Sequence, residues 1–567
     1  MCGILGNFGY IEREEFLTHV ENSSHLLSRR GPDQRNIINV ENFLAVHSRL
    51  IVQGNDDDGV QPFRFKNLVL LYNGNLYNKD LLKKKLISKG HHFVGISDTE
   101  VVALSIAEWG NKAFEKFNGF YALAYIDLGN KKLTLARDKL GQKPLYYARN
   151  TESVFFGSTE TLVPKKHCGN IRNESYVDFI TYGFVPSPNT MFRNLFSVKP
   201  GSYISFSYRN EKISVTEETR YWQPNITNKV NDINQATELI AEAISESMED
   251  GLNASIDVAC LYSGGVDSSL IFSNARTIND GICAITADFG LHDDAKLRSQ
   301  DLVKSLKHKN HVIKNISQAE VTTSLDRTNR ICDSPFDDTS IIPSNIVFST
   351  VKEAGYSVAL TGDGADELFC GYSSFQRLSK MEKLLSQKYD VVRSISKGIF
   401  GCIASFYNGA DLARVFMNEK ELLVDLSCNG FKKREWADSI ESEYDPFHHV
   451  RAILDEVDDL DTISKYRILN LTFKLPNQML YKVDRASMFN SVEARPLFLN
   501  DNIVETALNI SSKVMLKQGT KSILKNIYQR QLPTPGWKLP KTGFGWKTES
   551  YQHIFNQNDR AYVKKKT

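Results

Sequence analysis

The chain has 567 residues, with 69 lysines and arginines against 67 aspartates and glutamates and a formal net charge of +2. This length exceeds one ordinary hydrophobic core, so we expect at least two domains, and the balanced charge argues against a dedicated nucleic-acid binder. Hydrophobic residues make up 41% of the chain, and no stretch approaches the roughly 20 apolar residues needed to span a bilayer.

The eight cysteines are scattered, without a Cys-x-x-Cys pair or a Cys/His cluster at zinc spacing. They indicate reduced thiols rather than a disulfide framework. The N-terminus also lacks the basic and then apolar pattern of a signal peptide. We therefore expect a cytoplasmic protein with neither a membrane nor a nucleic-acid partner.

The first third of the chain alternates short apolar runs with Gly, Asn and Asp, and two segments read as capped helices. The expected strands lie within residues 44–52, 68–77, 120–128, 132–138, 144–149 and 153–158. The expected helices lie within residues 78–90 and 98–110. Many strands with few helices predict a layered β-sheet structure with helices outside it, an α+β domain over residues 1–215.

From about residue 230 the pattern changes to strands that alternate with amphipathic helices. Buried runs at residues 256–262, 282–289, 311–316 and 355–363 are separated by expected helices at 268–278 and 295–308. This alternation indicates a parallel sheet covered on both faces, followed from about residue 375 by a helical extension. We predict a second, α/β domain over residues 230–567.

The stretch "LYSGGVDSS" follows one of these strands and opens a helix. Gly264 and Gly265 would let backbone N–H groups approach a phosphate, Ser263 and Ser268 add hydroxyl donors, and Asp267 could hold Mg²⁺. A lone Gly-Gly would be read as a simple turn. The full Ser-Gly-Gly-x-Asp-Ser string between a strand and a helix favours phosphate binding.

A second acidic loop, "LTGDGADELFCGY", supports this interpretation. Thr361 and Gly362 lie beside Asp363 and Asp366 at the end of an expected strand, where ligands gather in open α/β sheets. The competing interpretation is a Ca²⁺ loop, but the EF-hand positions are not filled. The loop therefore suits a magnesium–pyrophosphate group.

Cys2 has two interpretations, because a buried cysteine near a terminus is usually a small hydrophobic residue. If Met1 is removed, the thiol and a free α-amine belong to one residue, and the amine can act as the base. Asn73 and the Gly74 N–H could then form an oxyanion hole, while Asp98 could bind an ammonium group and Arg49 a carboxylate. Together these groups suit an amino acid with a side-chain amide.

These motifs resemble the glutamine-dependent asparagine synthetase family of bacterial type. "MCGILG", "RRGPD", "HSRL", "YNGNLYN" and "SDTEV" are similar to a class II glutamine amidotransferase domain of the N-terminal-nucleophile hydrolase type. "LYSGGVDSS", "TGDGADELFCGY", "VDRASMFNSVEARPLFL", "GTKSILK" and "PKTGFGW" are similar to the synthetase domain, of the PP-loop ATP pyrophosphatase type. The resemblance covers nearly the whole chain in the expected order.

The resemblance implies the substrates glutamine, ATP with Mg²⁺, and a carboxylate acceptor, with aspartate as the first expectation. It implies Cys2 as the nucleophile, with Arg49, Asn73, Gly74 and Asp98 around glutamine. It also implies that Leu261, Ala287, Thr361 and Gly362 line the ATP site, that Asp267 and Asp366 hold Mg²⁺, and that Lys521 stabilises charge at the adenylated carboxylate. From the residues alone, Lys521 would be read as a solvated helix lysine. An apolar passage for ammonia and a homodimer are further expectations.

Three positions depart from the family pattern. Arg29 stands where His is usual, Leu539 lies near a missing Arg before "PKTGFGW", and Asp363 replaces the Glu of well-known aspartate enzymes. Because Asp363 is expected near the acceptor, amidation of a sugar (hexuronic acid) or another metabolite carboxylate stays open as an alternative. A third hypothesis, a non-catalytic relative, is disfavoured because Cys2, the Ser-Gly-Gly-x-Asp-Ser string and Lys521 are all retained.

Overall fold

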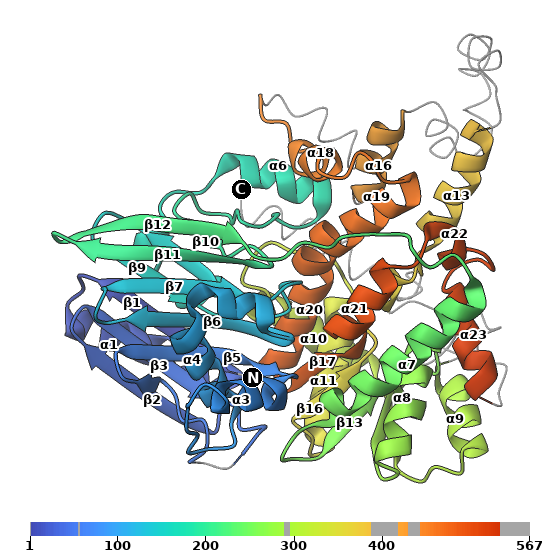
Figure 1. The fold of residues 1–567 in the computed structure, drawn as a ribbon, viewed down its shortest axis with the longest axis horizontal. Coiled ribbons are helices and arrows are strands. Elements are labelled where there is room, and N and C mark those ends of the chain that lie inside the picture. The colour runs from blue at the N-terminus through green and yellow to red at the C-terminus, as the bar shows by residue number, and fades with distance from the viewer. Residues whose placement is uncertain (1, 55–56, 289–294, 387–417, 429–442, 533–567) are drawn as a thin grey trace.

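The computed structural model describes residues 2–54, 57–288, 295–386, 418–428 and 443–532. In this part of the chain no helix is long and apolar enough to cross a membrane. A β-sandwich and a parallel-sheet domain lie side by side, and helix α20 (Leu480–Phe489) runs along their boundary (Figure 1).

The first domain is a sandwich of two antiparallel six-stranded sheets. In spatial order the first sheet contains β10 (Leu195–Ser197), β8 (Tyr146–Arg149), β9 (Ser153–Gly157), β1 (Gly3–Gly9), β3 (Phe43–Arg49) and β2 (Gln34–Val40). The second contains β12 (Lys212–Arg220), β11 (Ser202–Arg209), β7 (Lys132–Arg137), β6 (Gly119–Asp127), β5 (Leu68–Leu76) and β4 (Phe63–Phe65). All pairings within these sheets are antiparallel.

Helices cover the outer faces of both sheets. They are α1 (Arg13–Asn22), α2 (Ser24–Arg30), α3 (Lys79–Ile87) and α4 (Asp98–Trp109), with the short α5 (Lys165–Cys168), η1 (Gly110–Lys116) and η2 (Glu160–Leu162). Helix α6 (Asn173–Tyr182) lies instead against the second domain, where the Tyr182 hydroxyl donates to the carbonyl oxygen of Pro446. One core lies between the sheets, a second under α1 and α2, and a third under α3 and α4. Because the central strands are covered on both faces, they read as continuous apolar runs rather than alternating ones.

The second domain is built on a five-stranded, fully parallel sheet. Its spatial order is β15 (His311–Asn315), β14 (Cys283–Asp288), β13 (Val258–Leu261), β16 (Val358–Thr361) and β17 (Glu493–Pro496). Val258 and Cys260 belong to the core on one face and Ala259 to the core on the other, as the two-residue period of a strand requires. The expected fold class, a layered sandwich followed by an α/β domain, is confirmed.

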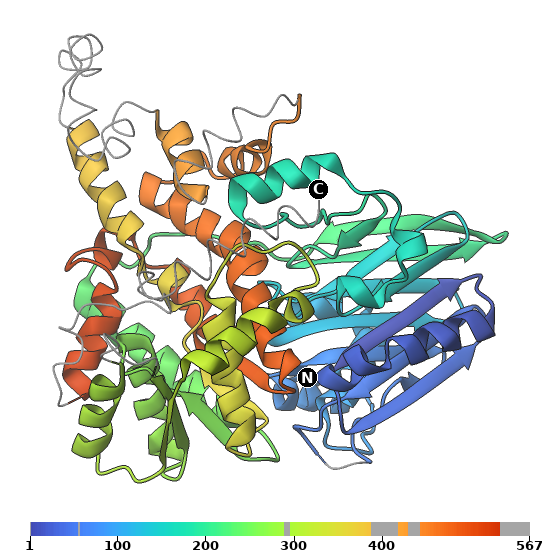
Figure 2. The same cartoon turned by 180° about the vertical axis from the view of Figure 1, so that it is seen from behind.

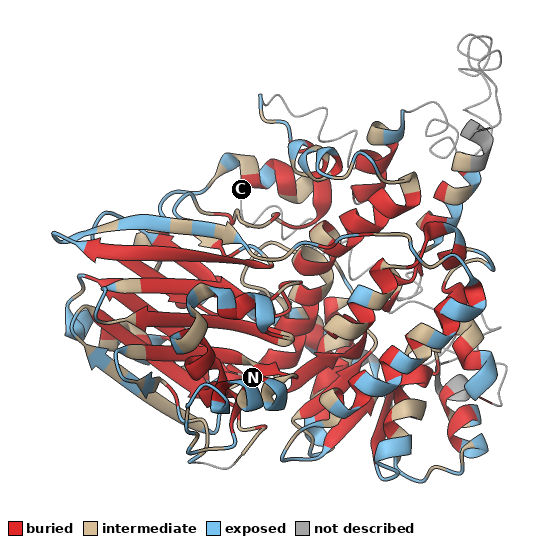
Figure 3. Cartoon of the chain, viewed as in Figure 1, coloured by how far each residue is buried: buried red, intermediate tan, exposed pale blue. Residues whose placement is uncertain are grey.

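Helices flank this sheet and extend beyond it. Those around the sheet are α7 (Ile233–Leu252), α8 (Val266–Ile278), α9 (Ala295–Ser305), α10 (Gln318–Ile331), α11 (Ile341–Glu353), α12 (Ala365–Leu368) and α20 (Leu480–Phe489). The extension contains α13 (Ser373–Ser386), α16 (Glu419–Ser427), α18 (His448–Asp455), α19 (Thr462–Leu469), the π-helical η3 (Asn470–Met479), η4 (Leu497–Leu499), α21 (Asp501–Leu508), α22 (Ser512–Met515) and α23 (Ser522–Gln531). Figure 2 shows these helices stacked beside the sheet, and Figure 3 shows buried residues running through both domains to their contact.

Candidate active sites in the two domains

Cys2 lies directly before β1 and is 7% exposed. Its backbone N–H donates a 2.8 Å hydrogen bond to Oδ1 of Asn73. Asn73 belongs to β5 of the other sheet and is fully buried. The candidate nucleophile is therefore held where one strand of each sheet meets the other.

The β5 segment Tyr72–Leu76 presents backbone donors on the side facing away from β6. The N–H of Tyr72 donates to Oε1 of Gln61 at 2.5 Å, and the N–H of Leu76 donates to Oδ2 of Asp98 at 3.0 Å. Because alternate residues of a strand direct their N–H groups the same way, the N–H of Gly74 points to this side too. The buried Nδ2 of Asn73 has no hydrogen-bond partner among the described residues. These two donors suit a developing oxyanion.

Glycine at position 74 is required by packing. A Cβ there would lie 2.2 Å from the carbonyl oxygen of Phe120 and 2.7 Å from Cβ of Tyr121 on the neighbouring strand β6. Any side chain would therefore push β5 away from β6 and displace the donors of Asn73 and Gly74.

Asp98 and Arg49 provide opposite charges near Cys2. The carboxylate of Asp98 accepts hydrogen bonds from the hydroxyl of Tyr72 and the N–H of Leu76, both at 3.0 Å. Arg49, at the end of β3, is 6% exposed and donates to the carbonyl oxygen of Gln53 at 3.3 Å. A carboxylate and a guanidinium suit the ammonium and carboxylate ends of a free amino acid.

Burial shifts the pKa values of these groups. It raises the pKa of the Cys2 thiol, which disfavours the thiolate. It also raises the pKa of Asp98, although the hydrogen bonds from Leu76 and Tyr72 oppose that shift. A thiol with a raised pKa needs a base to become a nucleophile, and the α-amine of Cys2 stays the predicted base.

In the second domain, the predicted ATP-site residues lie at the carboxyl edge of the parallel sheet. Leu261 ends β13, Ala287 lies near the end of β14, and Thr361 ends β16. The chain runs from β13 outward through β14 to β15 and later returns to β16 and β17 on the other side. This reversal of strand order is where open α/β sheets bind ligands.

The loop between β13 and α8 has the geometry that its glycines predict. Gly264 adopts a φ of +72°, which favours glycine. The Ser263 N–H donates to Oγ of Ser268 at 3.2 Å, and the two serine hydroxyl oxygens lie 3.1 Å apart. Gly265 precedes the first residue of α8, so the N-terminus of this helix opens onto the loop. Such a loop can cradle a phosphate.

Lys521 is 6% exposed and lies between two carboxylates. Its Nζ forms ion pairs with Oδ2 of Asp267 and, at 2.7 Å, with Oδ1 of Asp366. Burial opposes its charge, but the two carboxylates outweigh burial and hold the pKa of Lys521 above its usual range. The alternative of a solvated helix lysine is wrong for Lys521, because the residue precedes α23 and turns inward with a φ of +55°.

The acidic loop places two further groups beside this pair. Asp363 accepts a 2.7 Å hydrogen bond from the Thr361 hydroxyl, and burial raises its pKa. Glu367 accepts a 2.5 Å hydrogen bond from Tyr372, and burial together with Asp366 raises its pKa to about 7. The structure thus brings Asp267, Asp363, Asp366 and Lys521 to one edge of the sheet.

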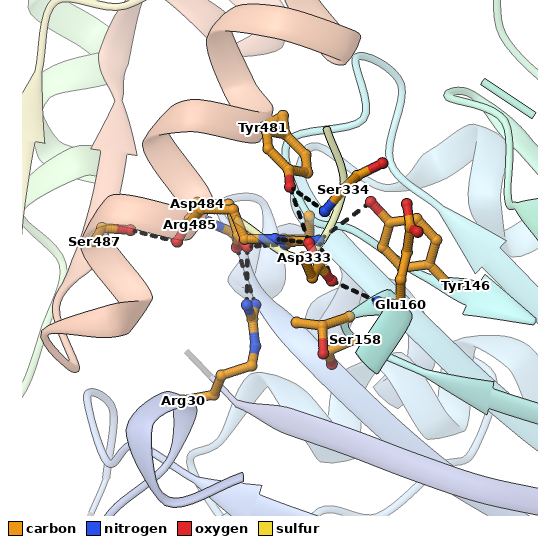
Figure 4. Close-up of polar contacts among 12 residues, drawn as sticks. Arg30, Tyr146, Ser158, Glu160, Asp333, Ser334, Tyr481, Asp484, Arg485 and Ser487 are labelled. Atoms are coloured by element: carbon orange, nitrogen blue, oxygen red, sulfur yellow. Dashed lines mark hydrogen bonds and ion pairs between the residues drawn. The ribbon is translucent and has the colours of Figure 1, made fainter. Parts of the chain in front are cut away.

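A buried chain of charges joins the two domains (Figure 4). The two terminal nitrogens of Arg30 donate to the Asp484 carboxylate at 2.8 and 2.9 Å, and Nε of Arg30 donates to the Cys2 carbonyl oxygen at 3.2 Å. Burial disfavours the Asp484 carboxylate, but Arg30 and Arg485 outweigh it and lower the pKa of Asp484 to about 2. Helix α20 is thereby tied to the backbone of the candidate nucleophile.

The same chain returns to the first domain through Arg485. This residue donates to Asp484 at 2.8 Å and to Oδ1 of Asp333 at 2.8 Å. Asp333 also accepts the N–H of Glu160 at 2.6 Å and the hydroxyl of Tyr481 at 2.9 Å (Figure 4). The carboxylates of Asp333 and Asp484 are thus both paired with arginines, as buried charges require.

The sequence analysis did not assign roles to Arg30, Asp484 or Lys482. Nζ of Lys482 donates to Oγ of Ser340 at 2.8 Å and its charge acts on Asp363. All three stand inside or beside the quoted motifs "RRGPD" and "VDRASMF", but only the folded chain shows which charges meet. The motif "PKTGFGW" and Leu539 lie outside the described residues.

Comparison with known proteins assigns a family model to each of the two domains. A family model described as glutamine amidotransferase domain matches residues 1–222, and one described as asparagine synthase matches residues 239–565. Asparagine synthetase [glutamine-hydrolyzing] 1 of Bacillus subtilis is 25% identical over 96% of this chain and 87% of its own length. A putative asparagine synthetase [glutamine-hydrolyzing] 2 of Methanocaldococcus jannaschii is 24% identical over 86% of this chain and 98% of its own length.

Among solved structures, an allosteric regulatory enzyme of purine biosynthesis matches with a TM-score of 0.30 and 16% identity, covering 55% of this chain and 80% of its own. The asparagine synthase model alone covers more than half of the chain, and the amidotransferase model covers most of the remainder. The chain therefore belongs to the asparagine synthase family, as a glutamine-dependent amidating enzyme.

Proposed function

We propose that this enzyme makes asparagine from aspartate, ATP and glutamine through an acyl-adenylate. The observation that carries the proposal is Lys521, which is buried between Asp267 and Asp366 beside the Ser263–Ser268 loop. A buried cation between two carboxylates at this edge of the sheet supports a site that binds ATP together with a second substrate. The glutaminase half is supported by the Cys2 surroundings.

In the first domain, Sγ of Cys2 attacks the side-chain amide carbon of glutamine. Asn73 Nδ2 and the Gly74 N–H stabilise the oxyanion, while Asp98 and Arg49 hold the ammonium and carboxylate groups of the substrate. Ammonia leaves and a glutamyl thioester forms on Cys2. Water then attacks the thioester carbon, which releases glutamate and restores the thiol.

In the second domain, a carboxylate oxygen of aspartate attacks the α-phosphorus of ATP and pyrophosphate leaves. Ammonia attacks the acyl carbon of the resulting adenylate, AMP leaves, and asparagine forms. Lys521 stabilises negative charge that develops on the carboxylate and the α-phosphate in both steps. Ser263, Gly264, Gly265 and Ser268 hold the phosphates, and Leu261, Ala287, Thr361 and Gly362 line the rest of the nucleotide site.

Mg²⁺ fits the acidic groups of this site. Oδ1 of Asp267 is buried without a hydrogen-bond partner among the described residues, and Asp366 lies across Lys521 from it. No group of three or more potential ligands gathers within the described part of the chain. Two carboxylates suit Mg²⁺, which takes its other ligands from phosphates and water and would neutralise phosphate charge. Calorimetry should therefore show that Mg²⁺ increases the affinity for ATP less in Asp267→Asn than in the wild type.

Ammonia must move from Cys2 to the adenylate without protonation in bulk water. A small cavity of about 40 Å³ lies between the domains, lined by residues of both, including Tyr146, Phe184, Leu480 and Asp484. Neither Cys2 nor a predicted ATP-site residue lines this cavity, and its lining includes the ionisable side chains of Arg137, Glu160 and Asp484, so the apolar ammonia passage stays a prediction.

Product analysis tests the acceptor. Purified enzyme with ATP, Mg²⁺, ammonium and one carboxylate at a time should release AMP with aspartate and form asparagine. AMP release with hexuronic acids or other carboxylates, but not with aspartate, would contradict the proposed acceptor and leave the adenylation chemistry intact. Half-buried Asp363 is the residue to vary in that case, because it lies beside Lys482 at the loop.

A further inference from the structure

A crevice of about 440 Å³ opens between the two domains, away from Asp267 and Lys521. Its walls come from α2 and the segment around η2 in the first domain, and from the end of α10 and the end of α20 in the second. The volume falls in the range of small-molecule sites. None of the residues assigned to ATP, glutamine or the acceptor lines it.

The charges that line the crevice do not balance. Arg30 and Arg485 are compensated by Asp484 and Asp333 through the interdomain chain of Figure 4. Arg29 and Arg330 also face the crevice, and neither forms an ion pair with a carboxylate of the described residues. The wall therefore carries two uncompensated guanidinium groups.

Arg29 is held in place rather than free to leave the crevice. Its guanidinium carbon lies 4.1 Å from the centre of the Phe489 ring, and its carbonyl oxygen accepts a 2.6 Å hydrogen bond from the Ser491 hydroxyl. Burial, together with the charges of Arg330 and nearby Arg327, lowers the pKa of Arg29. The positive charges of these arginines repel one another, and a bound anion would offset this repulsion.

The remaining lining indicates the kind of anion. Thr159 and Thr161, whose hydroxyl oxygens lie 3.2 Å apart, offer hydrogen bonds beside the guanidinium groups. Guanidinium forks and hydroxyls match the several oxygens of a phosphate. Leu26 and Phe489, both partly exposed, add an apolar surface on which an organic group can pack.

We propose that this crevice binds a small phosphomonoester, with its phosphate between Arg29 and Arg330 and its organic group against Leu26 and Phe489. Because both domains supply ligands, the bound molecule bridges them. The site is separate from the nucleotide site at Lys521, so the proposal does not depend on the identity of the acceptor.

The test uses the full-length protein and two probes, inorganic phosphate and phenyl phosphate, in calorimetry and in thermal unfolding at constant ionic strength. We expect both probes to bind and to raise Tm, with phenyl phosphate binding more tightly. Arg330→Ala, and Arg29→Ala with Arg330→Ala, should weaken binding at least about tenfold. Because Arg330 is exposed, we expect Arg330→Ala to fold even if the double variant does not.

Two control variants identify the site. Arg149→Ala removes an exposed arginine elsewhere on the sandwich, and Lys521→Ala alters the nucleotide site; both should keep the phosphate response. A response that survives Arg330→Ala but is lost in Lys521→Ala would place the phosphate in the nucleotide site and overturn the proposal. Malonate binding as tightly as phosphate, or phenyl phosphate binding no better than phosphate, would overturn the assigned ligand class.

Discussion

The two candidate active sites are both buried, but they balance their charges differently. Around Cys2, burial raises the pKa of both the thiol and Asp98, and Nδ2 of Asn73 has no partner among the described residues. Around Lys521, the cation is already satisfied by Asp267 and Asp366. We expect glutamine to supply the missing partners of the first site, and the substrates of the second site to replace the ion pairs that Lys521 makes. Four substitutions test this difference.

Cys2→Ala should have the largest effect. It removes the proposed nucleophile, so glutamine-dependent synthesis should fall by at least about 10³-fold, while synthesis from added ammonium should persist. Steady-state assays of AMP release with each nitrogen source measure this. Cys168→Ala, at another buried cysteine of the same domain, is the matched control. Equal loss with both nitrogen sources would show that the domains are not separable in this way.

Lys521→Ala should produce the opposite pattern. It removes a preorganised cation, so ammonium-dependent synthesis should fall by about 10²–10³-fold in kcat, while glutamine hydrolysis should change little. The control is Lys517→Ala, which alters an exposed lysine four positions before Lys521 and should leave kcat for synthesis unchanged. A kcat for synthesis within a few-fold of wild type would remove Lys521 from the mechanism.

Asp98→Asn should raise the KM for glutamine about ten- to hundredfold, the scale of losing a charged hydrogen-bond partner. Tyr72→Phe keeps the carboxylate and removes one hydrogen bond to it, so its effect on KM should be smaller. Because burial raises the pKa of Asp98, the wild-type KM for glutamine should rise as pH falls and the carboxylate is protonated. A KM that stays unchanged in Asp98→Asn would exclude the proposed ammonium contact.

Asp484→Asn tests the charges that join the two sites, with the smallest expected effect. The pKa of Asp484 is lowered to about 2 in the folded protein, below the ordinary aspartate value of 3.8. Its stabilisation is therefore present above the unfolded pKa and is lost as pH falls toward the folded pKa, by about 1 kcal/mol between pH 5 and pH 3.

Urea unfolding at both pH values measures this loss. The variant should lack that part of the pH dependence and should be less stable at pH 7, where Arg30 loses its carboxylate. The control is Asp445→Asn, which removes a more exposed carboxylate that pairs with Arg451. Its free energy of unfolding should change between pH 5 and pH 3 as that of the wild type does. Identical pH profiles for wild type and Asp484→Asn would show that this ion pair does not stabilise the fold.

Much of the fold could be predicted from local sequence. The expected helices at 78–90 and 98–110 correspond to α3 and α4, and the buried runs at 256–262 and 355–363 contain β13 and β16. Periodicity and capping residues carry this information because they act over a few neighbouring positions. The short β17 and the bend that turns Lys521 inward were not predicted, since each depends on packing against distant segments.

The sequence by itself determined the domain classes and which residue types could act, because glycine loops, strand patterns and a second-position cysteine are local features. Only the tertiary structure decided which charges meet. Arg30 and Asp484 are 454 positions apart, as Lys521 and Asp267 are 254 apart, and their pairing depends on how the two sheets and α20 pack. Burial then raises the pKa values of Cys2, Asp98 and Glu367, because the cost of a charge is set by the surrounding protein and not by the neighbouring residues in the chain.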